Sequence, residues 1–205
     1  MSLLLCYDTE TTGLPVFDLP SADPRQPHMA QLAAVLFEEK SREVVASIDV
    51  VVRPSGWIIP DDVSAIHGIT TQRAMQVGVG EATALSLFDE LWLTADKRLA
   101  YNESFDARIM RIAYKRYRND AEADTWKAGP AICAARLATP IMNMAPTEAM
   151  VATGRRHAKM PKLSEAFEHF TGKPLENAHS AIVDVRAAME VYFRIMDRAK
   201  EPTKP

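Results

Sequence analysis

Apolar residues in this chain fall into short runs that are separated by polar segments containing proline or glycine. Such runs, rich in Val, Ile, Leu and Ala, are typical of buried strands. The runs at 29–38 and 43–53 are separated only by the polar segment 39–42, which predicts an antiparallel hairpin. The other runs that predict strands lie at 3–7, 98–101 and 131–133.

Helices are predicted where apolar residues recur at intervals of three and four. In 80–95, Leu85, Phe88 and Trp92 fall on one side of the helix, and in 104–118 an apolar side is separated from a basic one. Because helices and strands alternate after the hairpin, the predicted fold class is α/β, a mixed sheet with helices on both faces. Further helical segments lie at 70–75, 134–142, 163–170 and 179–199.

Two polar segments predict surface loops. Prolines at 15, 20, 24 and 27 exclude a helix between the first two long runs. Residues 147–162 are polar and basic and predict an exposed loop. The wider region 119–162 is expected to be a longer loop region within a single domain that spans residues 1–205.

The composition is that of a globular protein. Of the 205 residues, 47% are hydrophobic and 25% are charged, which excludes disordered and fibrous classes. No apolar run approaches the roughly 18 residues of a membrane span. The N-terminal segment also lacks the basic start and the cleavage site of a signal peptide. We therefore expect a cytoplasmic protein without a membrane partner.

The net charge and the number of cysteines limit the kinds of binding site that we expect. The net charge is −3, so no basic surface covers the whole protein and any phosphate binding must be local. The 2 cysteines, Cys6 and Cys133, lie in apolar runs. This placement favours reduced structural thiols over a disulfide framework or a zinc site.

Asp8 and Glu10 follow the first apolar run and are two positions apart, so both side chains project from the same side of a strand. Two neighbouring carboxylates repel each other unless a cation lies between them, and oxygen ligands suit Mg²⁺ or Mn²⁺. The alternative is that Asp8 begins a turn and Glu10 is solvated. The pair alone supports the two interpretations equally.

Two further groups of polar residues lie at predicted boundaries. Asn102, Phe105 and Asp106 lie where a strand meets a helix, and His179 and Asp184 lie at the start of the last helix. Taken singly, Asp106 is explained as a charge that the helix dipole favours, and His179 as a capping or surface histidine. Residues five apart share a helical face only where the helix start is irregular.

Together, the three groups resemble, in order and separation, the three motifs of the DEDDh 3'-to-5' exonucleases. The resemblance extends from Leu3 to about Tyr192 and includes the segment 66–70, Ile-His-Gly-Ile-Thr. It implies a ribonuclease H-like fold, whose mixed five-stranded sheet has an antiparallel second strand, in agreement with the predicted hairpin. The matching motifs are Asp8-Thr-Glu10-Thr-Thr-Gly13, Asn102-x-x-Phe105-Asp106 and His179-x4-Asp184.

The resemblance also implies an activity. It predicts hydrolysis of phosphodiester bonds from the 3' end of DNA or RNA, with a single-stranded substrate, two Mg²⁺ or Mn²⁺ ions as cofactors, and release of nucleoside 5'-monophosphates. Asp8, Glu10, Asp106 and Asp184 would bind the metal ions, and His179 would act as general base. Substrate contacts are predicted for Thr9, Thr11, Gly13, Leu14, His67, Asn102 and Phe105.

Two positions depart from the family pattern. Tyr101 stands where many relatives have histidine, and Cys133 and Ala134 stand where an Asp-Thr pair is common. Two other functions share the motifs, a proofreading subunit of a polymerase and a catalytically silent nucleic-acid binding module. All five catalytic positions are occupied, which disfavours a silent module. The chain ends soon after the last helix, which favours a free-standing nuclease. The sequence does not distinguish DNA from RNA as the substrate. It also does not define the oligomeric state.

Overall fold

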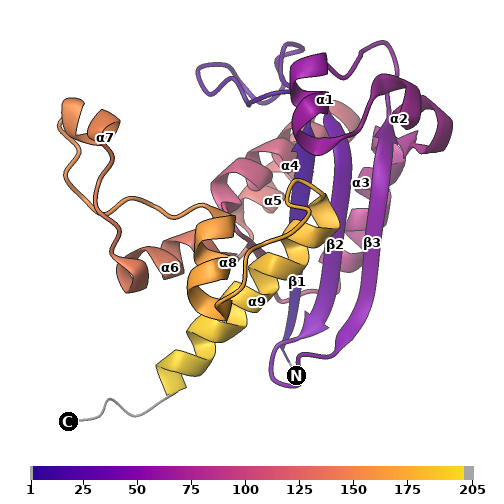
Figure 1. Ribbon diagram of the computed structural model, residues 1–205. Helices are drawn as coiled ribbons and strands as arrows, with labels where there is room; N and C mark the ends of the chain where they lie inside the picture. Colours follow the sequence, from indigo (N-terminus) through magenta and orange to yellow (C-terminus); the bar gives the residue numbers. More distant parts are fainter. Residues whose placement is uncertain (1, 201–205) are drawn as a thin grey trace, which may run out of the picture.

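A sheet of six strands lies at the centre of the protein in the computed structural model, which describes residues 2–200 (Figure 1). The strands are β1 (Leu3–Thr11), β2 (Met29–Glu38), β3 (Val44–Arg53), β4 (Val79–Gly80), β5 (Lys97–Ala100) and β6 (Ala131–Cys133). In space they follow the order β4-β3-β2-β1-β5-β6. β2 is antiparallel to β1 and β3, and the other neighbouring strands are parallel.

The predicted mixed sheet with an antiparallel second strand is confirmed, with one strand more than the five expected. The additional strand is β4, which has 2 residues and pairs with Val52 and Arg53 of β3. A strand of this length contains no alternation of apolar and polar residues, so the sequence pattern does not reveal it.

Helices lie on both faces of the sheet and beyond its edges (Figure 1). They are α1 (Asp61–His67), α2 (Thr71–Val77), α3 (Glu81–Trp92), α4 (Glu103–Tyr117), α5 (Asp120–Ala128), α6 (Ala134–Met142), α7 (Glu148–Ala152), α8 (Leu163–Thr171) and α9 (Ala181–Lys200). Leu4 and Cys6 of β1 pack in one hydrophobic core with α6, α8 and α9, whereas Leu5 and Tyr7 pack in another with α3, α4 and α5. Side chains along β1 therefore alternate between the two faces.

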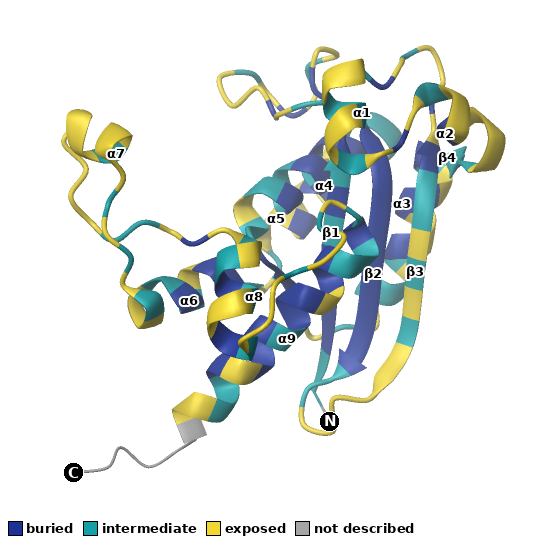
Figure 2. Ribbon diagram, in the orientation of Figure 1, coloured by how far each residue is buried: buried dark blue, intermediate teal, exposed yellow. Residues whose placement is uncertain are grey.

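The helices that the sequence did not predict bury few side chains. α1 buries none of its residues, and α5 buries only Ala123 and Trp126, so neither shows an apolar repeat of helical period. In the region 119–162, α5, β6 and α6 form regular structure. The largely exposed part is an arm, residues 143–162, which contains α7 and projects away from the sheet (Figure 2).

The cysteines and the proline-rich segment agree with their predictions. Cys6 and Cys133 are free thiols. The segment between β1 and β2 contains neither helix nor strand. No helix within residues 2–200 is long and apolar enough to cross a membrane. The expected domain limits, 1–205, include Met1 and residues 201–205, which lie outside the described part of the chain.

Candidate active site

Asp8 and Glu10 lie within β1, which continues to Thr11 although its apolar run ends earlier. Asp8 pairs with Ala33 of β2 and Glu10 pairs with Gln31, so the neighbouring strand fixes the backbone of both acids. Because the two positions have the same parity as Cys6, both carboxylates lie on the α9 side of the sheet. The structure therefore supports paired carboxylates on a strand over a turn that begins at Asp8.

Asp106 lies in the first turn of α4 and is joined to β1 through Thr9. Its Oδ1 accepts hydrogen bonds from the Thr9 amide, at 3.1 Å, and from the Thr9 hydroxyl, at 2.8 Å. Both residues are buried. Thr9, a predicted substrate contact, therefore uses both of its hydrogen-bond donors on Asp106. This geometry supports a positioning role for Thr9.

His179 and Asp184 lie at the start of α9, but only Asp184 is part of the helix. The helix begins at Ala181, and His179 precedes it with a φ of 69°, in the left-handed region. The predicted helix start at residue 179 is thus wrong by two residues, because the backbone of His179 has a left-handed conformation that does not continue the helix. A histidine outside the helix can turn back, and its amide donates to Asp184 Oδ2 at 3.1 Å.

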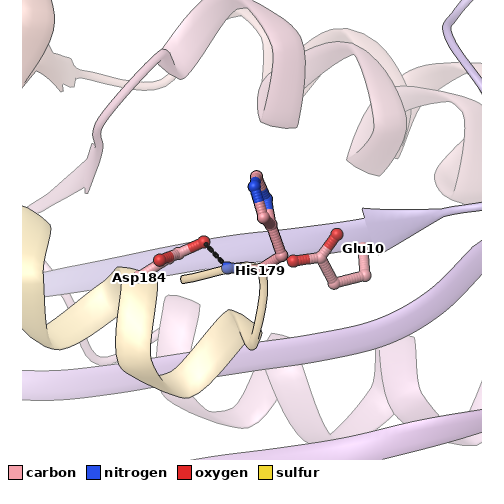
Figure 3. Close-up of side chains that lie close together, drawn as sticks. All are labelled: Glu10, His179 and Asp184. Carbon is pink, nitrogen blue, oxygen red and sulfur yellow. Dashed lines mark hydrogen bonds between the residues drawn. The ribbon is translucent and has the colours of Figure 1, made fainter. Parts of the chain in front are cut away.

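Glu10, His179 and Asp184 converge although they come from distant parts of the sequence. A ring nitrogen of His179 and one carboxylate oxygen of each acid all lie within 4.8 Å of one another (Figure 3). His179 is exposed, whereas Asp184 is buried. The cluster therefore has one side open to solvent and one side within the protein.

Gln31 holds the start of α9 against the sheet, a contact that no motif predicted. Its Oε1 accepts a hydrogen bond from the Ala181 amide at 3.2 Å, and its Nε2 donates to Asp49 at 2.6 Å. Gln31 is also the partner of Glu10 across the β1–β2 pair. The sequence does contain one signal for this contact, because Gln31 is a polar residue within an apolar run. A buried amide side chain requires hydrogen-bond partners.

Burial raises the pKa of all four carboxyl groups, and repulsion from neighbouring carboxylates adds to it for Asp8, Glu10 and Asp106. Burial raises the pKa of Glu10 to about 7, with a further contribution from Asp184. The pKa of Asp8 is raised by burial and then by the other three carboxylates. Burial also raises the pKa of Asp106 and of Asp184, although hydrogen bonds that each accepts oppose the change. Without a cation, ionising this cluster is therefore unfavourable.

The cluster has the donor set of a divalent-cation site. Asp184 Oδ1 is buried and has no hydrogen-bond partner among the described residues. A buried oxygen without a partner is rare in folded proteins, and a cation would satisfy it. Carboxylate oxygens are also the ligands that Mg²⁺ and Mn²⁺ prefer. The residues present therefore fit the metal ions that the sequence resemblance implies.

A cavity of about 520 Å³ opens beside His179 and Asp184. Asn102, a predicted substrate contact at the start of α4, lines this cavity. The hydroxyl of Tyr101 lies 2.9 Å from the carbonyl oxygens of Pro161 and Lys162, and this shared donor fixes the end of the arm at the cavity. The motifs did not indicate the other lining residues, which are Met160, Pro161, Lys162, Leu163, Ser164, Leu175 and Ala178.

The predicted substrate contacts in the turn after β1 and on α4 differ in their exposure to solvent. Leu14 is 78% exposed. The Thr11 hydroxyl donates to the carbonyl of Gly13 at 2.8 Å and so stabilises the turn. Phe105 is partly buried against the core on the α4 side of the sheet. Leu14 is therefore available to a ligand, whereas Phe105 contributes mainly to packing.

His67 lies at the end of α1, close to the cluster. Its Nδ1 accepts a hydrogen bond from the Ile69 amide at 3.1 Å. Burial lowers the pKa of His67, and the nearby His179 lowers it further. Its Nε2 is buried without a hydrogen-bond partner in residues 2–200. Two of the predicted substrate contacts, His67 and Asn102, thus lie near His179.

The comparison with family profiles identifies the chain. The profile of the Exonuclease family, RNase_T, matches residues 5–192. The chain belongs to this family. The resemblance drawn from the motifs is thereby confirmed, and family membership supports a nuclease function. No curated protein matches this exonuclease-family chain.

Solved structures of E. coli exonuclease I have the same fold as this exonuclease-family chain. The complex with a dT13 oligonucleotide is 20% identical, with a TM-score of 0.73 over 98% of this chain and 42% of the other. The zinc-bound complex with single-stranded DNA is 21% identical, with a TM-score of 0.71 over 98% and 41%. At these identities the likeness shows the ribonuclease H-like exonuclease fold. The chain spans about two fifths of the length of these relatives.

Proposed function

We propose that the protein is a metal-dependent 3'-to-5' exonuclease that acts on single-stranded DNA or RNA and releases nucleoside 5'-monophosphates. The observation that carries this proposal is the meeting of Asp8, Glu10, Asp106, His179 and Asp184 from β1, α4 and the start of α9. The exonuclease family supports hydrolysis, and the oligonucleotide complexes of E. coli exonuclease I support a single-stranded substrate.

Two divalent cations, Mg²⁺ or Mn²⁺, are the proposed cofactors. Asp8, Glu10, Asp106 and Asp184 would supply the oxygen ligands, since the other three carboxylates lie close enough to Asp8 to raise its pKa. When bound, such ions neutralise charge on a scissile phosphate and make an attacking water more acidic. E. coli exonuclease I has been solved with single-stranded DNA in both a zinc-bound and a metal-free form.

His179 is the proposed general base. Its ring lies beside Glu10 and Asp184, and the side chain is exposed, so it can take a proton from a water among the carboxylates and pass it to solvent. An imidazole accepts protons near neutral pH. The left-handed backbone of His179 supports this role, because strained conformations occur mainly where function requires them.

The cavity beside His179 is the proposed site of the 3'-terminal nucleotide. A volume of about 520 Å³ is sufficient for a nucleotide. Asn102 offers hydrogen bonds to the sugar or base, and Lys162 offers a positive charge to a phosphate. The exposed Leu14 offers an apolar surface on which any base can lie, so binding would not depend on base identity.

The convergence of the five residues favours catalysis over a silent binding module. A free-standing nuclease, rather than a subunit of a polymerase, stays a prediction from the sequence. The cytoplasmic location stays an expectation from the sequence.

The proposal is tested with 5'-labelled single- and double-stranded DNA and RNA, each incubated with Mg²⁺, with Mn²⁺ or with EDTA. We expect a ladder of products that shorten from the 3' end, formed fastest on a single strand and only with a divalent cation. The control is Asp8→Asn, which keeps the size of the side chain but removes its charge. Internal cleavage, immediate release of the labelled 5' nucleotide, or equal activity in EDTA would contradict the proposal.

A further inference from the structure

A second cavity, of about 240 Å³, lies between α4 and α5 and is strongly basic. It is separate from the carboxylate cluster, because Ser104, Arg108 and Arg111 share one face of α4, whereas Asp106 lies on the opposite face. Lys127 of α5 and the end of β5 complete the cavity. The lining residues with polar side chains are Arg98, Glu103, Ser104, Arg108, Arg111 and Lys127.

Positive charge in this cavity exceeds what its own acids neutralise. Arg98 is buried and forms an ion pair with Glu103 at 2.8 Å, so these two charges balance. Arg111 donates to Asp124 at 2.8 Å, but the Asp124 side chain is 62% exposed and solvated. The remaining cations are Arg108, whose side chain donates to the neutral carbonyl of Leu19, and the exposed Lys127.

Each of the two arginines also has one donor without an acceptor. Arg108 Nε and Arg111 Nε are both buried and have no hydrogen-bond partner in the described part of the chain. Burial lowers the pKa of Arg108, and the neighbouring Arg111 lowers it further, so the two guanidinium groups repel each other. Like charges this close together are unfavourable, and an anion bound in the cavity would relieve their repulsion.

We propose that this cavity binds a phosphate group through Arg108, Arg111 and Lys127. Guanidinium groups have planar sets of N–H donors that match phosphate oxygens, which makes arginine pairs well suited to this ligand. The phosphate has two possible sources, the backbone of a bound nucleic acid strand or free phosphate. The first source, the backbone of a bound nucleic acid strand, rests on the proposed function.

The strand source is supported by the position of the cavity beside the catalytic one. The Ser104 hydroxyl donates to Asn102 Oδ1 at 3.2 Å, and Asn102 lines the cavity beside His179. The first turn of α4 thus contacts both cavities. A strand whose 3' end lies beside His179 can therefore pass around this turn and place an upstream phosphate against Arg108 and Arg111.

The first test measures inorganic phosphate binding to the full chain by calorimetry, without divalent metal and at constant ionic strength. We expect saturable binding to the wild type and to the control Lys40→Ala, which alters an exposed lysine in the β2–β3 turn. The double variant Arg111→Gln, Lys127→Ala should no longer bind phosphate. The single variant Lys127→Ala, at an exposed position, should weaken binding about two- to fivefold, the effect of one accessible ion pair.

The second test measures binding of a labelled single-stranded oligonucleotide at several salt concentrations, again without divalent metal. If the cavity binds a strand phosphate, the slope of log affinity against log salt should become less steep by about 0.7 for each phosphate that the double variant no longer binds. An unchanged slope in a variant that does not bind inorganic phosphate identifies free phosphate as the ligand. Unchanged phosphate binding and an unchanged slope would overturn the proposal. Neither test uses hydrolysis, so failure of the proposed nuclease function is detected separately.

Discussion

Thr9 donates two hydrogen bonds to a single oxygen of Asp106, one from its amide at 3.1 Å and one from its hydroxyl at 2.8 Å. The two residues are 97 positions apart in sequence, and this contact is what attaches α4 to the acidic end of β1. Both donors favour the ionised form of Asp106, and so they oppose the effect of its burial. Thr9 thus helps to maintain the charge of a proposed metal ligand.

Replacing Thr9 with valine should therefore reduce activity by about tenfold or more, the usual effect of removing a group that orients a metal ligand. Valine keeps the shape and the amide but removes the hydroxyl. The loss of that donor raises the pKa of Asp106 further, so the acidic limb of the pH-rate profile should move to higher pH. The matched control is Thr139→Val, because the Thr139 hydroxyl donates within α6, away from the cluster. An unchanged profile in Thr9→Val would contradict the assignment.

The raised pKa of Glu10 predicts how stability depends on pH in the absence of metal. An acid whose pKa is higher in the folded state binds more protons when folded than when unfolded. The free energy of unfolding should therefore fall as pH rises from about 4, the ordinary value for glutamate, through about 7, the folded value.

Thermal unfolding of Glu10→Gln and the wild type, measured from pH 4 to pH 8 in EDTA, tests this dependence. The variant should become the more stable protein as pH rises, because it lacks the charge that the cluster repels. Mg²⁺ should reverse the order at pH 8, since only the wild type keeps all the carboxylates. Glu168→Gln, on the exposed side of α8, serves as control and should follow the wild type. A wild type that gains stability over Glu10→Gln without metal would refute the explanation.

Activity should also require every carboxylate of the cluster. Alanine at Asp8, Glu10, Asp106 or Asp184 should abolish turnover while the protein remains folded, because the charges repel one another without metal and contribute little to the core. Circular dichroism and thermal unfolding check the folding, and the 3'-shortening assay checks turnover. Full activity in any of these variants, or unfolding in all of them, would be inconsistent with a metal-binding cluster.

The sequence predicts best those elements whose bounds coincide with a run of apolar residues. The bounds of β2, β6 and α6 agree with their apolar runs. The end of β1 does not, because Asp8 and Glu10 continue the hydrogen-bonded pairing with β2 while their side chains are polar. An apolar pattern reports which side chains are buried, not where backbone pairing stops.

The sequence likewise predicts some parts of the candidate site and not others. The motifs locate the acids and His179 because their order and spacing resemble those of the exonuclease family, whereas spacing within one element explains only the shared face of Asp8 and Glu10. Contacts between distant elements are not encoded locally, so neither the hydrogen bond from Ala181 to Gln31 nor the bond from Tyr101 to the arm could be predicted. The basic cavity is a similar case, since it combines side chains from β5, α4 and α5.

His179 separates the proposed mechanism from one that depends on metal alone. Its amide, not its ring, donates to Asp184, so a substitution at this position keeps the hydrogen bond to this proposed metal ligand. Asparagine suits the left-handed backbone, with its φ of 69°, because its side chain tolerates that region better than most. His179→Asn should therefore fold normally and bind metal and substrate as the wild type does.

Turnover of His179→Asn should nevertheless fall by roughly a hundredfold or more, the effect of losing a positioned proton acceptor. The pH-rate profile distinguishes this loss from a displaced ligand. If the missing function is proton removal, higher pH supplies hydroxide in place of the base, and the variant should recover part of its rate as pH rises. A displaced ligand would instead lower the rate at every pH and weaken Mg²⁺ binding. Wild-type turnover of the variant at neutral pH would show that His179 only shapes the start of α9.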